Sequence, residues 1–360
     1  MAMSWLNRWL KRKSRPGRKQ FGPNRFVPGV EPLDERIALA VTASFLAQAG
    51  ILSVFGDSLN NTITISRNAA GNILVNGGAV AIQGGTSTVA NTALVQVFGQ
   101  AGDDTDLNEG GAGSDTVEVN GGNGADVLLG GDGNDFIDGN QGNDLAFLGA
   151  GDDVFQWDPG DGNDTVEGQD GADTMLFNGS GLSEIFEASA NGGRVRFTRD
   201  VGNIVMDLND VEAIDLNALG GADTIVVNDL SGTDVVEINL NLAAAGGAGD
   251  AQPDTVIVSG TAGDDVILVV GDASGVAVLG LAARVNITGA EAANDRLVVN
   301  ALAGDDVVEA SGLSAGAIQR TADGTAGDDI LIGSDGDDIL LGAAGDDVLI
   351  GGPGDNIVIQ

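Results

Sequence analysis

The chain of 360 residues contains no cysteine, no histidine and no tyrosine. Without cysteine it can form neither disulfides nor zinc–thiolate sites, although this absence does not decide the compartment. Without histidine it lacks the Ser-His-Asp and Cys-His arrangements of nucleophilic hydrolases and the H-E-x-x-H motif of zinc proteases. Hydrolytic mechanisms that depend on these residues are therefore excluded.

Positive charge is also scarce outside the N-terminal segment. Residues 1–40 hold nine of the 16 Lys and Arg residues and three of the 53 acidic ones, which leaves seven basic and 50 acidic residues for the rest. A body with a net charge of about −43 repels itself strongly, and nucleic acid is an unsuitable partner for it. Bound divalent cations are the natural counter-charge, since hard cations prefer carboxylate and carbonyl oxygen.

Glycine, in contrast, is abundant, with 58 residues in the chain. Because each interior glycine costs a helix about 1 kcal/mol relative to alanine, long helices are disfavoured. The chain is also 42% hydrophobic, which is too apolar for a disordered linker. We therefore expect an all-β fold of short strands joined by tight turns.

A nine-residue unit, G-G-x-G-x-D-x-U-x with U a large apolar residue, recurs in two blocks, and residues 130–138 match every fixed position. The loop aspartates are Asp104, Asp115, Asp126, Asp135, Asp144, Asp153, Asp164 and Asp173 in the first block, and Asp329, Asp338 and Asp347 in the second, where Asn356 takes the next slot. The U residues are Leu128, Ile137, Ala146, Phe155, Val166, Met175, Leu331, Leu340, Leu349 and Val358. All of them are apolar, so we expect them to form a core.

Nine residues divide into a six-residue turn and a three-residue strand whose central side chain points inward. Two units make one coil of a parallel β-roll, so that each residue stacks on the residue 18 positions later. Asp126 then lies over Asp144, Asp135 over Asp153, and Asp329 over Asp347. Stacked carboxylates and loop carbonyls supply the six to eight oxygens that Ca²⁺ prefers, whereas Mg²⁺ demands tighter octahedral geometry. All eleven loop aspartates are thus candidate calcium ligands.

Without metal, the stacked carboxylates repel and the small apolar triplets give little core, so we expect calcium binding to be part of folding. The alternative is that Gly-x-Asp loops are ordinary turns, because Gly and Asp dominate turns. That alternative applies best to isolated loops such as Gly263–Asp265. If these loops are ordinary turns, the chain forms a structural solenoid that does not depend on calcium.

The sequence divides into five segments: a basic leader at 1–36, an N-terminal β module at 37–98, a first repeat block at 99–180, an irregular β-solenoid with degenerate repeats at 181–323, and a second repeat block at 324–360. In the irregular segment, residues 194–197, 204–206, 224–227 and 235–238 have strand character. A longer repeat of roughly 40 to 50 residues, which begins and ends on repeat-like loops, indicates that the solenoid continues through this segment.

The uncharged run from Ile37 to Phe55 allows three interpretations. It can be the apolar part of an export signal that ends at Ala47-Gln48-Ala49. It can be a linker followed by the first strand, or a membrane span, which its polar residues disfavour.

The nonapeptide unit resembles the RTX (repeats-in-toxin, hemolysin-type) calcium-binding proteins, most clearly at 130–138, 327–333 and 345–351. Residues 153–164 resemble the longer repeat that often ends such blocks. The resemblance implies a secreted or cell-surface protein with a calcium-binding β-roll that folds after export. Relatives often join the repeats to a protease, lipase, epimerase or pore-forming toxin, and no such segment is visible here. Residues 30–36 resemble an element near the start of many planctomycete surface and exported proteins.

Two functions compete. The first is a non-enzymatic, calcium-stabilised extracellular protein with a structural or adhesive role, whose partners are calcium ions and cell-surface polysaccharide or matrix. The second is a carbohydrate-active enzyme on a β-helix, because paired carboxylates alone can cleave glycosides. Such an enzyme needs aromatic side chains in its groove, and the body of the chain offers Trp157 and scattered phenylalanines.

Overall fold

A computed structural model describes residues 41–108 and 116–360. In these two ranges the regular elements are β-strands and one short 3-10 turn, η1 (Asn76–Gly78), so the all-β prediction is confirmed. No helix there is long and apolar enough to cross a membrane. The leader at 1–36, with its planctomycete-like element, and the predicted ligand Asp115 lie outside the described residues.

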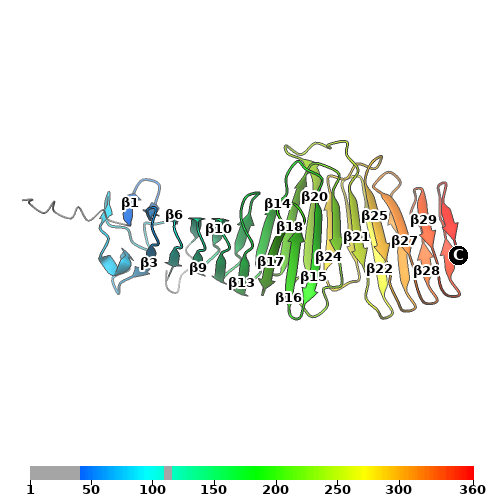
Figure 1. Cartoon of the computed structure of the whole chain (residues 1–360), viewed down its shortest axis with the longest axis horizontal. Coiled ribbons are helices and arrows are strands. Elements are labelled where there is room, and N and C mark those ends of the chain that lie inside the picture. Colours follow the sequence, from blue (N-terminus) through cyan, green and yellow to red (C-terminus); the bar gives the residue numbers. More distant parts are fainter. Residues whose placement is uncertain (1–40, 109–115) are drawn as a thin grey trace, which may run out of the picture. The chain divides into compact units, whose positions relative to one another are not determined.

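The strands form two sheets, and the chain passes back and forth between them (Figure 1). Sheet A consists, in neighbour order, of β30 (Val348–Ile350), β28 (Ile330–Ile332), β26 (Val307–Leu313), β22 (Val266–Asp272), β23 (Gly275–Leu279), β24 (Arg284–Thr288), β20 (Glu237–Ala244), β18 (Ala213–Leu219), β14 (Thr174–Asn178), β12 (Val154–Trp157), β10 (Phe136–Gln141), β8 (Val117–Asn123), β6 (Leu94–Ala101), β2 (Ile51–Phe55), β1 (Thr42–Leu46) and β5 (Ile82–Gln83). Sheet B consists of β31 (Ile357–Ile359), β29 (Asp338–Leu341), β27 (Gln319–Asp323), β25 (Arg296–Asn300), β21 (Thr255–Ser259), β19 (Thr224–Val227), β15 (Ile185–Asn191), β16 (Arg194–Arg199), β17 (Ile204–Asn209), β13 (Thr165–Asp170), β11 (Leu145–Ala150), β9 (Val127–Asp132), β7 (Thr105–Asn108), β3 (Thr62–Arg67) and β4 (Ile73–Val75).

Neighbouring coils pair in parallel with the register that the nine-residue unit predicts. Val127 of β9 faces Leu145 of β11, and Phe136 of β10 faces Val154 of β12. In the second block Ile330 of β28 faces Val348 of β30. Each pair is two units apart in sequence, so the chain forms a parallel β-roll in both repeat blocks.

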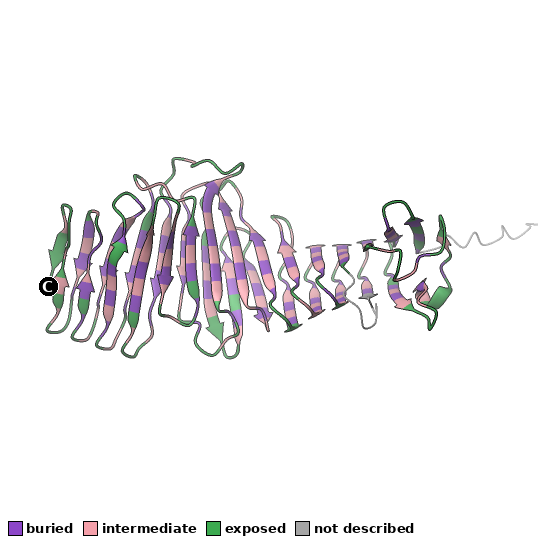
Figure 2. Ribbon diagram, turned by 180° about the vertical axis from the view of Figure 1, so that it is seen from behind, coloured by how far each residue is buried: buried purple, intermediate pink, exposed green. Residues whose placement is uncertain are grey.

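Burial alternates along the strands, with every second residue inside (Figure 2). Eight of the ten U residues, from Leu128 to Met175 and at Leu331 and Leu340, have no exposed surface. Leu349 is only partly buried, and Val358 is 46% exposed. Both lie on β30 and β31, which are the outermost strands of their sheets and pack on one neighbour each.

Two three-stranded meanders interrupt the simple winding. The meander β15–β16–β17 adds antiparallel pairs to sheet B, and β22–β23–β24 does the same in sheet A. Each meander places three consecutive strands in one sheet, where simple winding would place one. The two insertions therefore balance, and the sheets are in step again at β25 and β26. The meanders also explain the longer repeat, since each lies inside one copy of it.

The uncharged run at the start of the described residues forms a hairpin. Strand β1 pairs antiparallel with β2, and Phe45, which faces Leu52, is 5% exposed. Ala47, Gln48 and Ala49 lie in the turn between these strands. Of the three interpretations of this run, the structure shows strands at residues 42–46 and 51–55, while residues 37–40 lie outside the described residues.

The coils beside the first meander have an aromatic core. Trp157 stacks on Phe177 with ring centroids 4.1 Å apart, and Phe186 and Phe197 pack around Phe177. Trp157 also donates a hydrogen bond from its indole Nε1 to the Gly162 carbonyl at 3.0 Å, and it has no exposed surface. Packing of large rings is worth more than burial area alone, so the end of the first repeat block and the adjoining meander share a larger apolar core than the preceding nonapeptide coils.

Glycine at the fourth position of the unit is required by close stacking. Gly151 has φ of +146°, and a Cβ there would lie 1.8 Å from the Gly133 carbonyl oxygen of the preceding coil. Gly160, in the turn before β13, has φ of +123° but open space around its Cα. The two positions therefore separate the effect of stacking from that of backbone conformation.

We predict that Gly151→Ala lowers the free energy of unfolding by about 2–4 kcal/mol, because it combines a clash with an unfavourable φ. Gly160→Ala should lower it by about 1–2 kcal/mol, the backbone contribution alone. Urea unfolding of both variants in excess calcium measures the difference. Equal losses for the two variants would show that the glycine column is not tightly stacked.

Candidate metal centre

The loop aspartates lie immediately before strands, at the two edges where the coils turn from one sheet into the other. The tight turn and the parallel pairing fix each aspartate above the aspartate of the next coil. We call the resulting stacks aspartate rows: Asp104, Asp126, Asp144 and Asp164 before β7, β9, β11 and β13; Asp135, Asp153 and Asp173 before β10, β12 and β14; and Asp329 and Asp347 before β28 and β30.

One hydrogen bond repeats along every row. Within a row, the backbone N–H of every aspartate except the last donates to Oδ1 of the aspartate in the next coil, at 2.8 Å from Asp126 to Asp144 and 2.7 Å from Asp135 to Asp153. The bond from Asp329 to Asp347 measures 3.0 Å. The predicted stacking is thus present, and each carboxylate is fixed through one of its two oxygens.

The second carboxylate oxygen is the unusual feature of the site. It is buried and has no hydrogen-bond partner at Asp104, Asp126, Asp144, Asp153, Asp164, Asp173, Asp329 and Asp347. A buried carboxylate oxygen without a donor is costly, and a charged one more so unless a cation compensates it. A whole row of such atoms indicates that something other than this protein's hydrogen-bond donors satisfies them.

These oxygens lie beside the first glycine of their own unit. A Cβ on Gly121 would be 2.5 Å from Asp126 Oδ2 and 2.8 Å from the Gly139 carbonyl oxygen of the next coil. A Cβ on Gly139 would be 2.4 Å from Asp144 Oδ2. Glycine therefore leaves a space in which a carboxylate oxygen, and at Gly121 also a carbonyl oxygen, come close to one point.

Burial raises the pKa of seven row carboxyls, and nearby carboxylates raise it further: those of Asp104, Asp126, Asp144, Asp153, Asp164, Asp173 and Asp329. The pKa of Asp126 rises to about 6, that of Asp144 to about 8, and those of Asp164 and Asp173 to about 7. The N–H bonds described above oppose this shift and are too weak to cancel it. A cation beside the row would stabilise the ionised form instead.

The donors present suit calcium. They are carboxylate and carbonyl oxygens on glycine-containing turns. Such a set fits the variable coordination geometry of Ca²⁺ better than the strict octahedral geometry of Mg²⁺. Among the residues of 41–108 and 116–360, no three acidic side chains converge closely enough to hold a metal by themselves. Backbone carbonyls must therefore complete the coordination, with one or two aspartates of a row contributing the charge.

The structure places further aspartates in this geometry that the spacing did not identify. Asp223 donates from its N–H to Asp254 Oδ1 at 2.9 Å, and Asp306 donates to Asp329 Oδ1 at 2.9 Å. Oδ2 of both Asp223 and Asp306 is buried without a partner. Burial, together with nearby Asp254, raises the pKa of Asp223 to about 7. Their Gly-x-Asp loops were visible in the sequence, but coils of 31 and 41 residues hide the period.

Asp106 is an exception inside the core. It occupies the inward slot of its coil, beside Ile63 and Leu128, and neither carboxylate oxygen has a partner. Burial, reinforced by Asp104 and Asp126, raises its pKa to about 8. The pattern of apolar U residues gave no signal for this acid.

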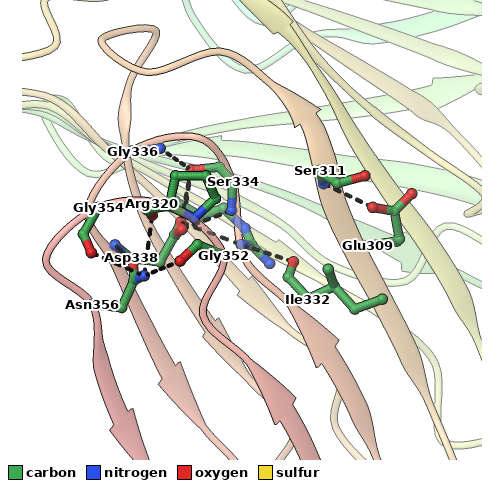
Figure 3. A network of polar contacts seen from close by, with 11 residues as sticks. Glu309, Ser311, Arg320, Ile332, Ser334, Gly336, Asp338, Gly352, Gly354 and Asn356 are labelled. Carbon is green, nitrogen blue, oxygen red and sulfur yellow. Dashed lines mark hydrogen bonds and ion pairs between the residues drawn. The ribbon is translucent and has the colours of Figure 1, made fainter.

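Asp338 differs from the other predicted ligands that the structure describes. It is buried in the same loop position, but both of its oxygens accept hydrogen bonds, from Ser334 and Arg320 (Figure 3). Its N–H donates to Asn356 Oδ1 at 2.8 Å. The loop of Asp338 therefore has the same backbone arrangement as the loops of the aspartate rows, but its carboxylate has no unpartnered oxygen.

We predict that Asp144→Asn removes about one bound calcium ion, because it removes the negative charge shared by the stacked loops. The matched control is Asp132→Asn, which removes the same charge from an exposed position on β9. Isothermal titration of the full chain with CaCl₂ gives both stoichiometries. A lower ion count in the control as well would mean that net charge, and not the row, determines binding.

The raised pKa values also predict how stability depends on pH. In calcium-free protein these carboxyls are neutral more readily when folded than when unfolded, so their contribution is fully present below about pH 4. It is lost as the pH rises through the folded pKa values of about 6 to 8. Calcium binds the ionised form, so the same rise in pH should stabilise the calcium-loaded protein and binding should release protons.

Thermal unfolding at pH 5 and pH 8, in buffers depleted of calcium by a chelating resin or supplied with calcium, tests this. The melting temperature should fall with pH in the first buffer and rise in the second. A rise in both buffers would contradict the assignment.

The comparison with known families agrees with this geometry. The family model of the RTX calcium-binding nonapeptide repeat, which spans four copies, matches residues 120–155, 160–179 and 323–358. These stretches contain every predicted ligand except Asp104 and Asp115, and they cover about a quarter of the chain. No curated protein matches the chain. RTX nonapeptide repeats bind Ca²⁺, and this chain carries them in the two blocks of its β-roll.

Proposed function

We propose that the chain is a secreted or cell-surface protein with a structural or adhesive role, in which calcium binding is coupled to folding of the two repeat blocks. The observation that carries this proposal is the row of buried carboxylate oxygens without donors, which begins at Asp104 and returns at Asp329. Without a cation, these groups can be buried only as neutral acids.

The coupling follows from the energies involved. A site that exists only in the folded state stabilises it, and one ion at 100 times its dissociation constant contributes about 2.7 kcal/mol. Several ions along the rows together equal the stability of about 5–15 kcal/mol that is typical of a domain. The apolar triplets of the repeat blocks contribute a narrow core, so calcium decides whether these blocks are folded.

The end of the first block and the wider coils that follow it have stabilising interactions that need no metal. Besides the aromatic core, side-chain amides form ladders along sheet A. Asn217 Nδ2 donates to Asn178 Oδ1 at 2.9 Å, and Asn241 Nδ2 donates to Asn217 Oδ1 at 3.1 Å. A parallel ladder joins Asp215, Asn239 and Asn286. Loss of calcium should therefore unfold the coils held by aspartate rows before this region.

An extracellular location accords with the calcium supply. Extracellular calcium modules bind at about 10⁻⁴–10⁻³ M, far above the concentration in cytosol. Sites of that affinity would leave the repeat blocks unfolded before export and fold them afterwards. The large negative charge outside residues 1–40 is tolerable only where cations are plentiful.

A structural role is favoured over the carbohydrate-active alternative. Sugar-cleaving grooves use exposed aromatic rings, and Trp157 is fully buried against Phe177. Its indole N–H is already bonded to the Gly162 carbonyl. The row carboxylates are fixed in loops by backbone N–H groups, which suits ion binding better than proton transfer to a substrate.

Circular dichroism and hydrogen exchange of the full chain test the coupling. In EDTA, exchange protection should be lost over residues 120–155 and in strands β28 and β30, and retained over residues 185–300. Calcium in the millimolar range should restore it, and the same concentration of magnesium should not. Protection in both blocks that is unchanged by EDTA would overturn the coupling.

The location is tested separately on cells that produce the protein naturally. External protease, added to intact cells in calcium and in EDTA, should digest the protein completely only in EDTA. If intact cells protect the protein in both conditions, it is not exposed at the surface.

A further inference from the structure

The loop of Asp338 carries its own cation. Arg320 of β27 lies directly beside Asp338 of β29 in the sheet register, 18 residues earlier in the chain. Its Nη1 forms an ion pair with Asp338 Oδ1 at 3.3 Å, and both side chains are fully buried. The same nitrogen donates to the Ile332 carbonyl at 3.3 Å (Figure 3).

The other oxygen of Asp338 is satisfied as well. Oδ2 accepts hydrogen bonds from the Ser334 backbone N–H at 2.7 Å and from Ser334 Oγ at 3.1 Å. In the aspartate rows, the corresponding Oδ2 atoms of Asp329 and Asp347 have no partner. At Asp338, the oxygen that would face an ion is already used by serine.

The neighbours of Asp338 in its own stack carry no second negative charge. The coil before it places the Arg320 cation in register, and the coil after it supplies the neutral Asn356. Calcium sites depend on how many charged oxygens they gather. A site with one carboxylate and an adjacent guanidinium is unsuitable for a divalent cation.

Arg320 is present mainly for its charge. Its Nε and Nη2 are buried and have no hydrogen-bond partner, so the guanidinium makes few of the bonds it could make. A buried arginine with unused donors is costly, and removing it would leave a buried carboxylate uncompensated, which is strongly destabilising. Compensation of Asp338 is the evident benefit.

We propose that Arg320 takes the role at Asp338 that calcium has in the aspartate rows, so that this loop rejects calcium and remains closed without it. This inference rests on the proposed function, since it assumes that the rows bind calcium. It contradicts the assignment of Asp338 as a ligand that its position in the repeat implies. In the second block, folding of the loop before β29 is then independent of calcium, and folding of the loops before β28 and β30 depends on it.

Calcium stoichiometry of the full chain distinguishes the two kinds of loop. Asp338→Asn should leave the number of bound ions unchanged, and Asp329→Asn should lower it by about one. If both substitutions lower the count, Asp338 binds calcium and the inference is wrong. If neither wild type nor variants bind calcium, the proposed function itself fails.

Arg320→Met tests the role of the guanidinium. In EDTA it should abolish exchange protection of residues 338–341, which wild type retains, and millimolar calcium should restore protection with about one additional ion. The control is Arg296→Met, which removes an exposed guanidinium on the adjacent strand β25 and should change neither result. Restoration in calcium without an additional ion, or wild-type loss of protection in EDTA, would overturn the inference. The Asp338→Asn comparison decides the question if Arg320→Met does not fold.

Discussion

The structure depends on one hydrogen bond, in which a backbone N–H of one coil donates to the carboxylate of the next. It aligns the coils, as between Asp126 and Asp144, and it directs the second carboxylate oxygen into a buried space beside glycine. The geometry that stacks the chain therefore also creates the requirement for a counter-charge. We propose that bound calcium supplies this counter-charge in the rows, and that Arg320 supplies it in the Asp338 loop.

This requirement divides the chain by the way each part is stabilised. The nonapeptide coils are narrow and carry charge that needs compensation. The end of the first block and the coils around the meanders bury Trp157 and Phe177 and form amide ladders such as Asn178–Asn217–Asn241. The two meanders do not disturb the winding of the coils on either side, because each sheet contains one of them and gains the same number of strands. Under the proposed function, the centre of the chain remains folded while the calcium-dependent coils respond to the ion concentration.

The sequence predicted what a nine-residue period determines. The register, the inward Leu128 and Ile137, and the stacking of Asp126 on Asp144 follow from turn and strand lengths alone. The strand expected at 235–238 begins at 237, since pairing with β18 sets its start. Features set by long coils were not predictable: Asp223 and Asp306 join rows across irregular spacing. Arg320 lies in a strand without a motif, so its partner becomes visible only when the coils are stacked.

The central claim is that calcium ions lie in the aspartate rows against oxygens that no donor satisfies. Crystals of the full chain grown in calcium, measured at a long X-ray wavelength, would locate these ions by anomalous scattering. We expect peaks at about 2.3–2.6 Å from Oδ2 atoms of the rows, beginning with Asp126 and Asp144, and no peak at Asp338. An anomalous map without peaks in the rows would contradict the account, because the buried carboxylates would then be neutral and the fold independent of metal.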